Sequence, residues 1–135
     1  MNKLNNKKVK YKYQGQDIVF DSKMEFEYFI EVILKNKLKF EFQPKFILQE
    51  GFTTKDGKKI RPITYTADFL IYEGKNKVII EIKGLATNEF KLKKKMFLYK
   101  FPDLEYKMLI KYDGKFVDWE ENEKRKRMNK KLKNT

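Results

Sequence analysis

Two short runs rich in β-branched and aromatic residues, 67–72 and 77–83, flank a glycine-containing turn sequence at 73–76. Runs of this composition on either side of a short turn predict a β-hairpin. If Tyr72 pairs with Lys77, the residue numbers of antiparallel partners sum to 149. One face of the hairpin is then wholly apolar, which gives the chain a sheet face to bury.

The same register gathers charged side chains at the open end of the hairpin. Asp68 faces Glu81, and Lys83 follows two residues later on the same face. Opposed Cβ atoms lie roughly 4.5–5.5 Å apart, so the two acids repel each other unless a positive charge lies between them. A magnesium ion meets this need, because it prefers oxygen ligands and is usually held by one or two carboxylates with water and phosphate. The alternative is an ion pair on a surface strand, which is how most Glu-x-Lys pairs occur.

The composition excludes several kinds of catalytic site. The 135 residues include no Cys and no His, which removes thiolate nucleophiles, Cys-type zinc sites, imidazole bases and Ser-His-Asp hydrolysis. Carboxylates, lysines and a metal ion remain as catalytic groups. A formal net charge of +13, carried by Lys far more than by Arg, predicts salt-sensitive and weakly sequence-specific binding of polyanions.

The length predicts a single domain with charged ends. We expect a basic flexible arm at 1–8, a core domain at 9–117 and a charged tail at 118–135, either a helix that grips a partner or a largely disordered segment. No apolar stretch approaches the ~20 residues of a transmembrane helix and no signal peptide opens the chain, so a cytoplasmic location without a membrane partner is expected.

Ser22 and Glu25 form the capping-box pattern, which predicts a helix that ends near Asn36. Glu25 thereby has two interpretations. As a capping residue it stabilises the beginning of the helix, and as a catalytic residue it shares a metal ion or orients water. It flanks the buried stripe of the helix beside Phe29, while Glu27 flanks the other side, so periodicity does not choose between them.

The segments around the hairpin supply further polar residues. Residues 38–48, interrupted by Pro44, predict a strand with an edge or a bend, and a second helix is predicted after Thr87 or Asn88. The apolar face of this second helix is expected to comprise Phe90, Leu92, Met96 and Leu98. The candidate DNA-contacting residues are Lys91, Lys93, Arg61 and Gln43. For each of these four, a solvated surface side chain is the alternative.

Several short motifs occur in an order that resembles a known superfamily. They are Phe20-Asp21-Ser22-Lys23-Met24-Glu25, Gln43-Pro44-Lys45-Phe46, Arg61-Pro62-Ile63-Thr64-Tyr65, Thr66-Ala67-Asp68-Phe69, Glu81-Ile82-Lys83-Gly84 and Lys91-Leu92-Lys93. In this order they resemble the PD-(D/E)XK nuclease superfamily, and within it small phage-encoded proteins and endonuclease I-type Holliday-junction resolvases. Ala67 stands where the superfamily has a nominal proline, and Ile82 occupies a position that a second acid often flanks in the closer family.

The resemblance implies a restriction-endonuclease-like α/β (α+β) core, with a mixed central β-sheet flanked by helices, that makes 9–117 a nuclease core domain. It implies a Mg²⁺-dependent endodeoxyribonuclease in which Mn²⁺ substitutes for Mg²⁺. Asp68, Glu81 and the Ile82 backbone carbonyl are then metal ligands, Glu25 completes the acidic cluster, and Lys83 supports the attacking water or the transition state.

The resemblance also implies a substrate and an assembly. Branched DNA of the Holliday-junction type, a role in DNA recombination and, if the chain is phage-encoded, the host cell cytoplasm are expected. Cutting two strands of a junction requires two active sites, so a homodimer is expected, without a small-molecule organic cofactor.

Three alternatives stay open at this level. The first is a non-catalytic DNA- or RNA-binding module with a nuclease-like fold, because positive charge alone explains nucleic-acid affinity. The second is a small ribosome-associated or structural RNA-binding protein. The third is a nuclease that uses Asp21 as the first acid of a ribonuclease-H-like sheet, which leaves Glu81 and Lys83 without a role.

Overall fold

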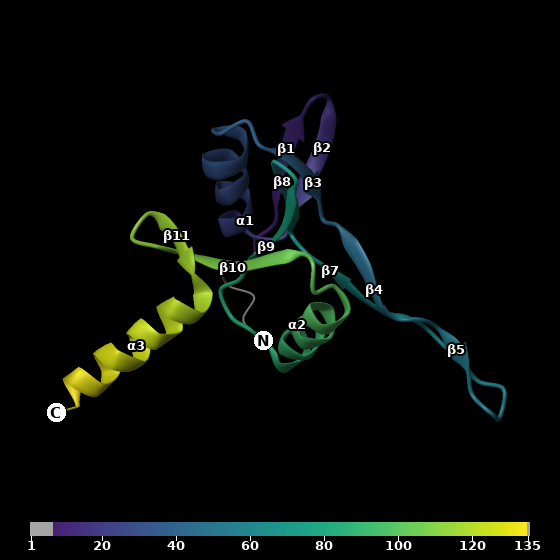
Figure 1. The fold of residues 1–135 in the computed structure, drawn as a ribbon. Coiled ribbons are helices and arrows are strands. Elements are labelled where there is room, and N and C mark those ends of the chain that lie inside the picture. Colours follow the sequence, from purple (N-terminus) through teal and green to yellow (C-terminus); the bar gives the residue numbers. More distant parts are fainter. Residues whose placement is uncertain (1–6, 135) are drawn as a thin grey trace. The chain divides into compact units, whose positions relative to one another are not determined.

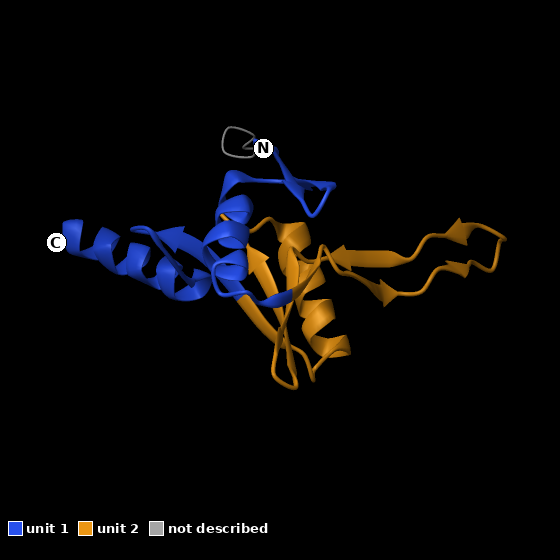
Figure 2. Cartoon of the chain, turned by 90° about the horizontal axis from the view of Figure 1, so that it is seen from above, with its two compact units in different colours: residues 1–39, 108–135 blue, residues 40–107 orange. Residues whose placement is uncertain are grey.

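A computed structural model describes residues 7–134, so most of the basic arm expected at 1–8 lies outside the described residues. The chain divides into two compact units, unit 1 (residues 1–39 and 108–135) and unit 2 (residues 40–107), which Figure 2 shows in blue and orange. The single domain expected from the length is therefore made of two units. Each unit is described separately below.

The elements follow one another along the chain as Figure 1 shows. Those of unit 1 are β1 (Val9–Tyr13), β2 (Gln16–Phe20), α1 (Lys23–Tyr28), the π-helix η1 (Phe29–Leu34), β11 (Lys115–Asp118) and α3 (Trp119–Lys133). Those of unit 2 are β4 (Lys45–Gln49), β5 (Phe52–Thr53), β6 (Lys59–Ile60), β7 (Ile63–Thr66), β8 (Phe69–Glu73), β9 (Asn76–Ile82) and α2 (Asn88–Lys100). The division falls within β3 (Lys39–Phe42) and β10 (Glu105–Tyr112).

The fold is mixed α+β, as the sequence predicted. Hydrogen bonding orders five strands as β11-β10-β9-β8-β3 in one mixed sheet, and β1-β2, β4-β7 and β5-β6 form two-stranded pairs. No helix among residues 7–134 combines the length and the apolar character needed to cross a membrane.

Unit 1 is built around the helix that begins after Ser22. The Ser22 backbone is extended and its hydroxyl accepts a hydrogen bond from the Glu25 amide, which confirms the predicted N-cap. The predicted helix does not stay α-helical to Asn36, because a π-helix replaces it from Phe29 to Leu34. Capping and periodicity fix where a helix begins and which face it buries, but they do not report the spacing of its hydrogen bonds.

Aromatic side chains pack in two places within unit 1. Phe29 and Phe20 are fully buried, with ring centroids 5.2 Å apart, and Tyr11 lies 5.5 Å from Phe26. Lys111 of β10 forms ion pairs with acids of the helix, and the shorter of them is 2.9 Å to Glu31. These contacts pack the helix against the β1-β2 hairpin on one side and hold it to β10 on the other.

In unit 2 the central hairpin has the predicted register. Phe69 pairs with Ile80, Ile71 with Val78, and Tyr72 with Lys77. The ladder begins at Phe69, so Asp68 stands just outside the strand in which the sequence placed it. Leu70 and Ile79 on the other face are buried as well, so both faces of the hairpin lie in the core of the unit.

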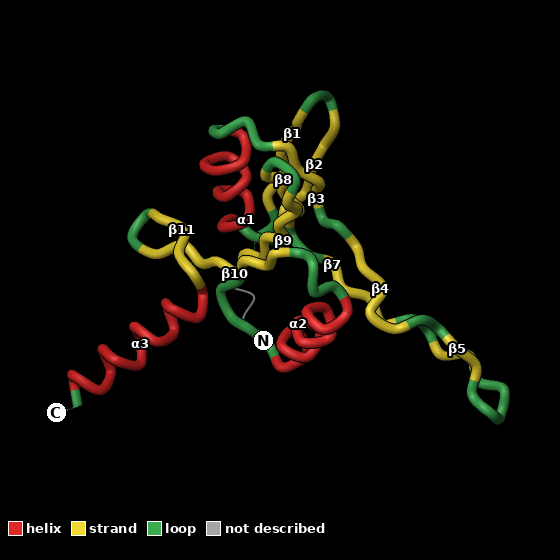
Figure 3. The backbone as a smooth tube through the Cα atoms, viewed as in Figure 1, coloured by secondary structure: helices red, strands yellow, loops and turns green. Residues whose placement is uncertain are grey.

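The remaining strands of unit 2 form a long ribbon. The strand predicted over 38–48 is two strands, β3 and β4, because the chain bends at Gln43 and Pro44. β4 pairs with β7, and the pair continues into β5 and β6, which Figure 3 draws as yellow tube joined by green loops. At Gly51 the backbones of the two sides of the ribbon approach closely, since a Cβ there would lie 2.9 Å from the Ile60 carbonyl oxygen.

The helix α2 begins after Thr87, whose hydroxyl accepts from the Phe90 amide, as the cap signal predicted. Its buried residues are Phe90 and Phe97, and Phe97 packs on Phe46 of β4 with ring centroids 4.9 Å apart. The predicted apolar face is wrong for Leu92, which is 60% exposed, and for Leu98, which is 41% exposed. Residues two apart lie about 200° apart on a helix of 3.6 residues per turn, so Phe90 and Leu92 cannot share one face.

Candidate active site

Two acids meet at the open end of the β8-β9 hairpin. Asp68 is 9% exposed and Glu81 is 3% exposed, and the Asp68 carboxyl group lowers the pKa of Glu81 against the effect of burial. The Asp68 Oδ2 atom accepts from the Ile82 amide at 2.7 Å, and the Asp68 carbonyl accepts from the Gln43 amide at 2.9 Å. Because the backbones on both sides hold Asp68, its carboxylate is fixed beside Glu81 without a place in the strand ladder.

Two tyrosines complete the surroundings of Glu81. The Tyr65 hydroxyl donates to Glu81 Oε1 at 2.5 Å and lies 2.8 Å from the Tyr106 hydroxyl. Burial, followed by the nearby negative charge of Glu81, raises the pKa of both phenols, so they remain protonated hydrogen-bond donors. Nothing in the sequence predicted that these two tyrosines would surround Glu81, because a tyrosine in a predicted strand is normally a packing residue.

Lys83 is the cation nearest to the acids among the described residues. Its Nζ atom lies 3.7 Å from Glu81 Oε2 and 4.4 Å from the centroid of the Phe90 ring, and the side chain is partly exposed. The Phe90 ring thus helps to hold the Lys83 ammonium close to Glu81, while the Lys83 side chain remains partly exposed to solvent. The structure therefore brings Asp68, Glu81 and Lys83 together, as the hairpin register predicted.

The electrostatics of the pair are unfavourable for two ionised acids. Burial raises the pKa of Glu81 above its ordinary value, although Lys83, Tyr65 and Asp68 act in the opposite direction. One ammonium at the edge and one phenol do not compensate for two buried negative charges. The site accordingly has a strong preference for a further cation or a proton.

The donor chemistry fits a hard divalent cation. Asp68 and Glu81 present carboxylate oxygens, and the Ile82 carbonyl points to the same side of its strand as its amide, which binds Asp68. Between residues 7 and 134, no group of three or more His, Cys, Asp or Glu side chains is arranged to hold a metal ion. The oxygen donors that the site offers are two carboxylates and a backbone carbonyl, and Mg²⁺ is usually held by one or two carboxylates together with water and phosphate.

Glu25 lies in unit 1 and has a clear structural role. It is buried, its amide donates to the Ser22 hydroxyl at 3.1 Å, and that hydroxyl donates to Glu25 Oε2 at the same distance. The cap formed by Ser22 is confirmed, whereas a bond from the Ser22 amide to the Glu25 carboxylate, which the capping box predicts, stays a prediction. The membership of Glu25 in the acidic cluster also stays a prediction.

Replacing Ser22 with alanine is expected to lower the free energy of unfolding by about 1 kcal/mol, because the helix loses the side-chain oxygen that caps it. Thermal unfolding measures the change, and Ser22→Thr is the matched control because it keeps a capping hydroxyl. Equal stability of Ser22→Ala and the wild type would show that the cap contributes nothing.

The predicted DNA-contacting residues occupy different settings. Gln43 lies beside Asp68 through its backbone, Arg61 is exposed in the ribbon, and Lys91 is exposed on α2. Lys93 forms an ion pair with Glu89 at 3.5 Å. Lys94, which the sequence did not single out, lies over the ring of the tyrosine that contacts Tyr65, with its Nζ atom 5.4 Å from the ring centroid. Lys94 is therefore a cation of α2 that approaches the tyrosine pair.

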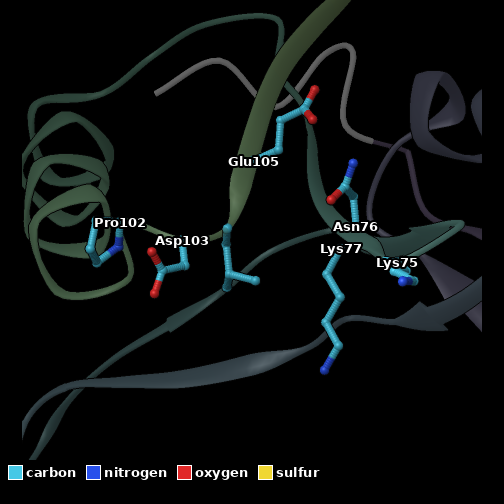
Figure 4. A pocket seen from close by; sticks show the side chains of 7 residues that line it. Lys75, Asn76, Lys77, Pro102, Asp103 and Glu105 are labelled. Atoms are coloured by element: carbon cyan, nitrogen blue, oxygen red, sulfur yellow. The ribbon is translucent and has the colours of Figure 1, made fainter.

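A pocket of unit 2 lies away from these groups. It has a volume of about 400 Å³ and is lined by residues 75–77 and 102–105, some of which Figure 4 shows as sticks. Residues 75–77 lie at the turn end of the β8-β9 hairpin, whereas Asp68 and Glu81 lie at its open end. The pocket is not the candidate site.

If the chain is the nuclease that the resemblance implies, replacing Tyr65 with phenylalanine is expected to move the acid limb of its pH–rate profile to higher pH. The substitution removes a hydrogen bond to the Glu81 carboxylate, so the pKa of Glu81 rises further. A hydrogen bond to a charged group is worth about 1.5–3 kcal/mol, which corresponds to roughly a tenfold or greater loss of rate near neutral pH. The rate is expected to recover as the pH increases.

Tyr72→Phe is the control for this measurement, because the Tyr72 hydroxyl donates to Glu41 at the surface. A Tyr65→Phe profile that falls uniformly at all pH values would contradict a role for Tyr65 in tuning Glu81.

Comparison with known proteins gives one match. Residues 1–118 match the model of a family described as "Protein of unknown function (DUF1064)". No curated protein matches the sequence significantly.

Proposed function

The chain belongs to the DUF1064 family, and we propose that it is a metal-dependent DNA endonuclease with a restriction-endonuclease-like core. The observation that carries the proposal is the buried pair of Asp68 and Glu81, with Lys83 beside it. Burying two acids next to each other costs stability, and such pairs with shifted pKa values are concentrated at functional sites.

The arrangement supports phosphodiester hydrolysis more than any other reaction. Asp68, Glu81 and the Ile82 carbonyl would hold Mg²⁺ or Mn²⁺, which when bound lowers the pKa of water and stabilises negative charge on phosphate. The Lys83 ammonium is placed to bind a non-bridging phosphate oxygen and to stabilise the charge that develops there. Tyr65 holds the Glu81 carboxylate in orientation and lowers the pKa of Glu81 against the effect of burial.

The electrostatics of the whole chain favour a polyanionic substrate. The net charge of +13 attracts nucleic acid without regard to sequence, and Lys91, Lys93, Lys94 and Arg61 add positive charge in unit 2, which contains the acids. A location in the cytoplasm, where such a substrate occurs, belongs to the same proposal.

The resemblance described above adds a specific substrate and an assembly. It favours branched DNA of the Holliday-junction type and a homodimer that supplies one active site for each of two cuts. It also assigns Glu25 to the acidic cluster. In that assignment Glu25→Gln lowers cleavage because it removes the carboxylate charge. Ser22→Thr does not lower cleavage, because it leaves the Glu25 carboxylate unchanged.

The experiment that tests the proposal is cleavage of a labelled four-way junction by the wild-type protein in Mg²⁺, compared with linear duplex and single strands of the same sequence. Paired incisions near the branch, dependent on Mg²⁺ or Mn²⁺ and absent in Lys83→Met, are the expected result. Cleavage of all substrates at one rate would retain the nuclease and remove the preference for branches. Absence of cleavage of every DNA substrate in either metal would remove the nuclease.

The alternative is a non-catalytic nucleic-acid-binding protein with a nuclease-like fold, which the net charge of +13 favours. Its signature is DNA or RNA affinity that depends on salt and is indifferent to both Mg²⁺ and Glu81→Gln. Competition between folded RNA and branched DNA for the protein separates an RNA-binding role from this one.

A further inference from the structure

The second half of α3 carries an unusual concentration of positive charge. Residues 124–133 contain seven Lys or Arg residues and no acid. From Lys126 to Asn134 every residue is exposed, and Figure 3 draws α3 as one continuous helix. We name residues 126–133 the basic half of α3.

The first half of α3 is anchored within unit 1. Asp118 caps the helix by accepting from the Glu121 amide at 3.0 Å, and Asn122 is buried. The Arg125 guanidinium donates to Asn122 Oδ1 at 2.6 Å and lies 3.7 Å from the centroid of the Tyr112 ring. These contacts fix the direction in which the basic half leaves the β10-β11 hairpin.

The basic half has no such support from acids in its own sequence. Lys126 reaches back to Glu123 at 3.1 Å, but beyond it the helix carries only like charges, with Arg127 and Lys131 four residues apart. Each like-charged pair at this spacing destabilises a helix by about 0.2–0.5 kcal/mol, and the helix dipole offsets part of this at the C-terminal end. A polyanion bound along the basic half would remove the repulsion.

The match to the family ends at residue 118, and α3 begins at Trp119. This helix is therefore an extension of the family segment. From Trp119 onward, seven Lys or Arg residues and three Glu residues (120, 121 and 123) give 7 − 3 = +4, so 13 − 4 = +9 remains on residues 1–118. The family segment is basic by itself, and the helix adds affinity to a surface that already attracts polyanions.

We propose that the basic half of α3 binds the phosphate backbone of a nucleic-acid duplex and lengthens the residence of the protein on it. The ligand rests on the proposed function, but the contact does not depend on cleavage. A lipid surface is disfavoured because only Met128 and Leu132 interrupt the cations, which is too little apolar surface for an interfacial helix. A second copy of the same helix is disfavoured because like charges would face each other.

The test is a charge-removal variant of the full chain, Arg127→Gln with Lys130→Gln, Lys131→Gln and Lys133→Gln. Glutamine keeps helix propensity and removes four exposed charges. The matched control removes four charges that are exposed elsewhere in unit 1, by Lys10→Gln, Lys12→Gln, Lys35→Gln and Lys115→Gln. Fluorescence anisotropy with a labelled DNA duplex, in chelator and over a range of salt concentrations, measures the dissociation constant.

The α3 variant is expected to bind at least ~10-fold more weakly at about 0.1 M salt, and its plot of log affinity against log salt is expected to be shallower by about 3.6 for four lost phosphate contacts. The control variant is expected to lose less than half of this. Equal losses in the two variants would overturn the proposal in favour of net charge alone. Unchanged duplex binding by the α3 variant would also overturn the proposal. In that case a lower affinity of the variant for anionic phospholipid vesicles would indicate a lipid partner, and weaker self-association would indicate a second copy of the chain.

The outcome is separable from the nuclease. Because binding is measured in chelator, loss of affinity in the α3 variant stands even if the wild type cuts no DNA. Conversely, wild-type cleavage with an unaffected α3 variant would keep the nuclease and remove this contact. Circular dichroism of the variant, expected to match the wild type without DNA, shows that the fold is retained.

Discussion

Replacing Asp68 with asparagine is expected to reduce junction cleavage by about 10³-fold or more while the fold is retained. Asparagine keeps an oxygen that accepts from the Ile82 amide, so the contact that orients residue 68 survives. The negative charge that would hold the metal is lost. Because the substitution also removes one of two buried acids, the metal-free variant is expected to unfold at a temperature no lower than that of the wild type.

Single-turnover cleavage in saturating Mg²⁺ measures the effect, with thermal unfolding of the same samples as the test of folding. Asp17→Asn is the matched control, because Asp17 is exposed on β2. A rate for Asp68→Asn close to that of the wild type would exclude the carboxylate pair from the reaction.

Replacing Glu81 with glutamine is expected to abolish cleavage and to stabilise the protein at neutral pH. Burial is the largest influence on the pKa of Glu81 and raises it above the ordinary value of 4.5. The folded state therefore binds the Glu81 proton more tightly than the unfolded state. Stability from this group is fully present below pH 4.5 and is lost as the pH rises through the folded-state pKa.

Glutamine does not ionise, and its oxygen accepts from Tyr65 as the carboxylate does. At neutral pH the variant is expected to unfold about 3 °C or more above the wild type, which corresponds to about 1 kcal/mol for a domain of this size. The difference should shrink as the pH falls toward 4.5.

Thermal unfolding of both proteins in chelator, from about pH 4.5 to about pH 8, measures the difference. Addition of Mg²⁺ is expected to raise the unfolding temperature of the wild type and to leave Glu81→Gln unchanged, because a ligand stabilises only the state that binds it. Glu105→Gln, at an exposed acid of unit 2, is the control. A constant temperature difference at every pH would mean that the ionisation of Glu81 does not cost stability.

Local patterns predicted the elements that carry the acids. The turn composition and the alternation of apolar residues gave the register of the β8-β9 hairpin, with Tyr72 opposite Lys77. The caps at Ser22 and Thr87 were recognised because the side chain that caps a helix lies within three residues of the amide that it binds. Interactions between residues this close in the sequence can be recognised from a short run of consecutive residues.

The contacts that surround the two acids could not be predicted in this way. Tyr65 and Tyr106 are 41 residues apart in the sequence, yet their hydroxyl groups lie 2.8 Å from each other. The Gln43 amide binds the Asp68 carbonyl only because the chain bends before β4. The exposure of Leu92 likewise depends on which stripe of α2 meets β4, and the composition of the helix does not specify this.

The sequence by itself thus determined which residues are candidates for catalysis, the pairing that brings Asp68 toward Glu81 and Lys83, and the net positive charge of +13. Tertiary structure alone decided that the acids are buried, that a phenol orients Glu81, and that the charged tail is a helix. The physical reason is that burial and hydrogen bonding between distant segments arise from packing, which raises the pKa of Glu81 through desolvation that no local pattern encodes.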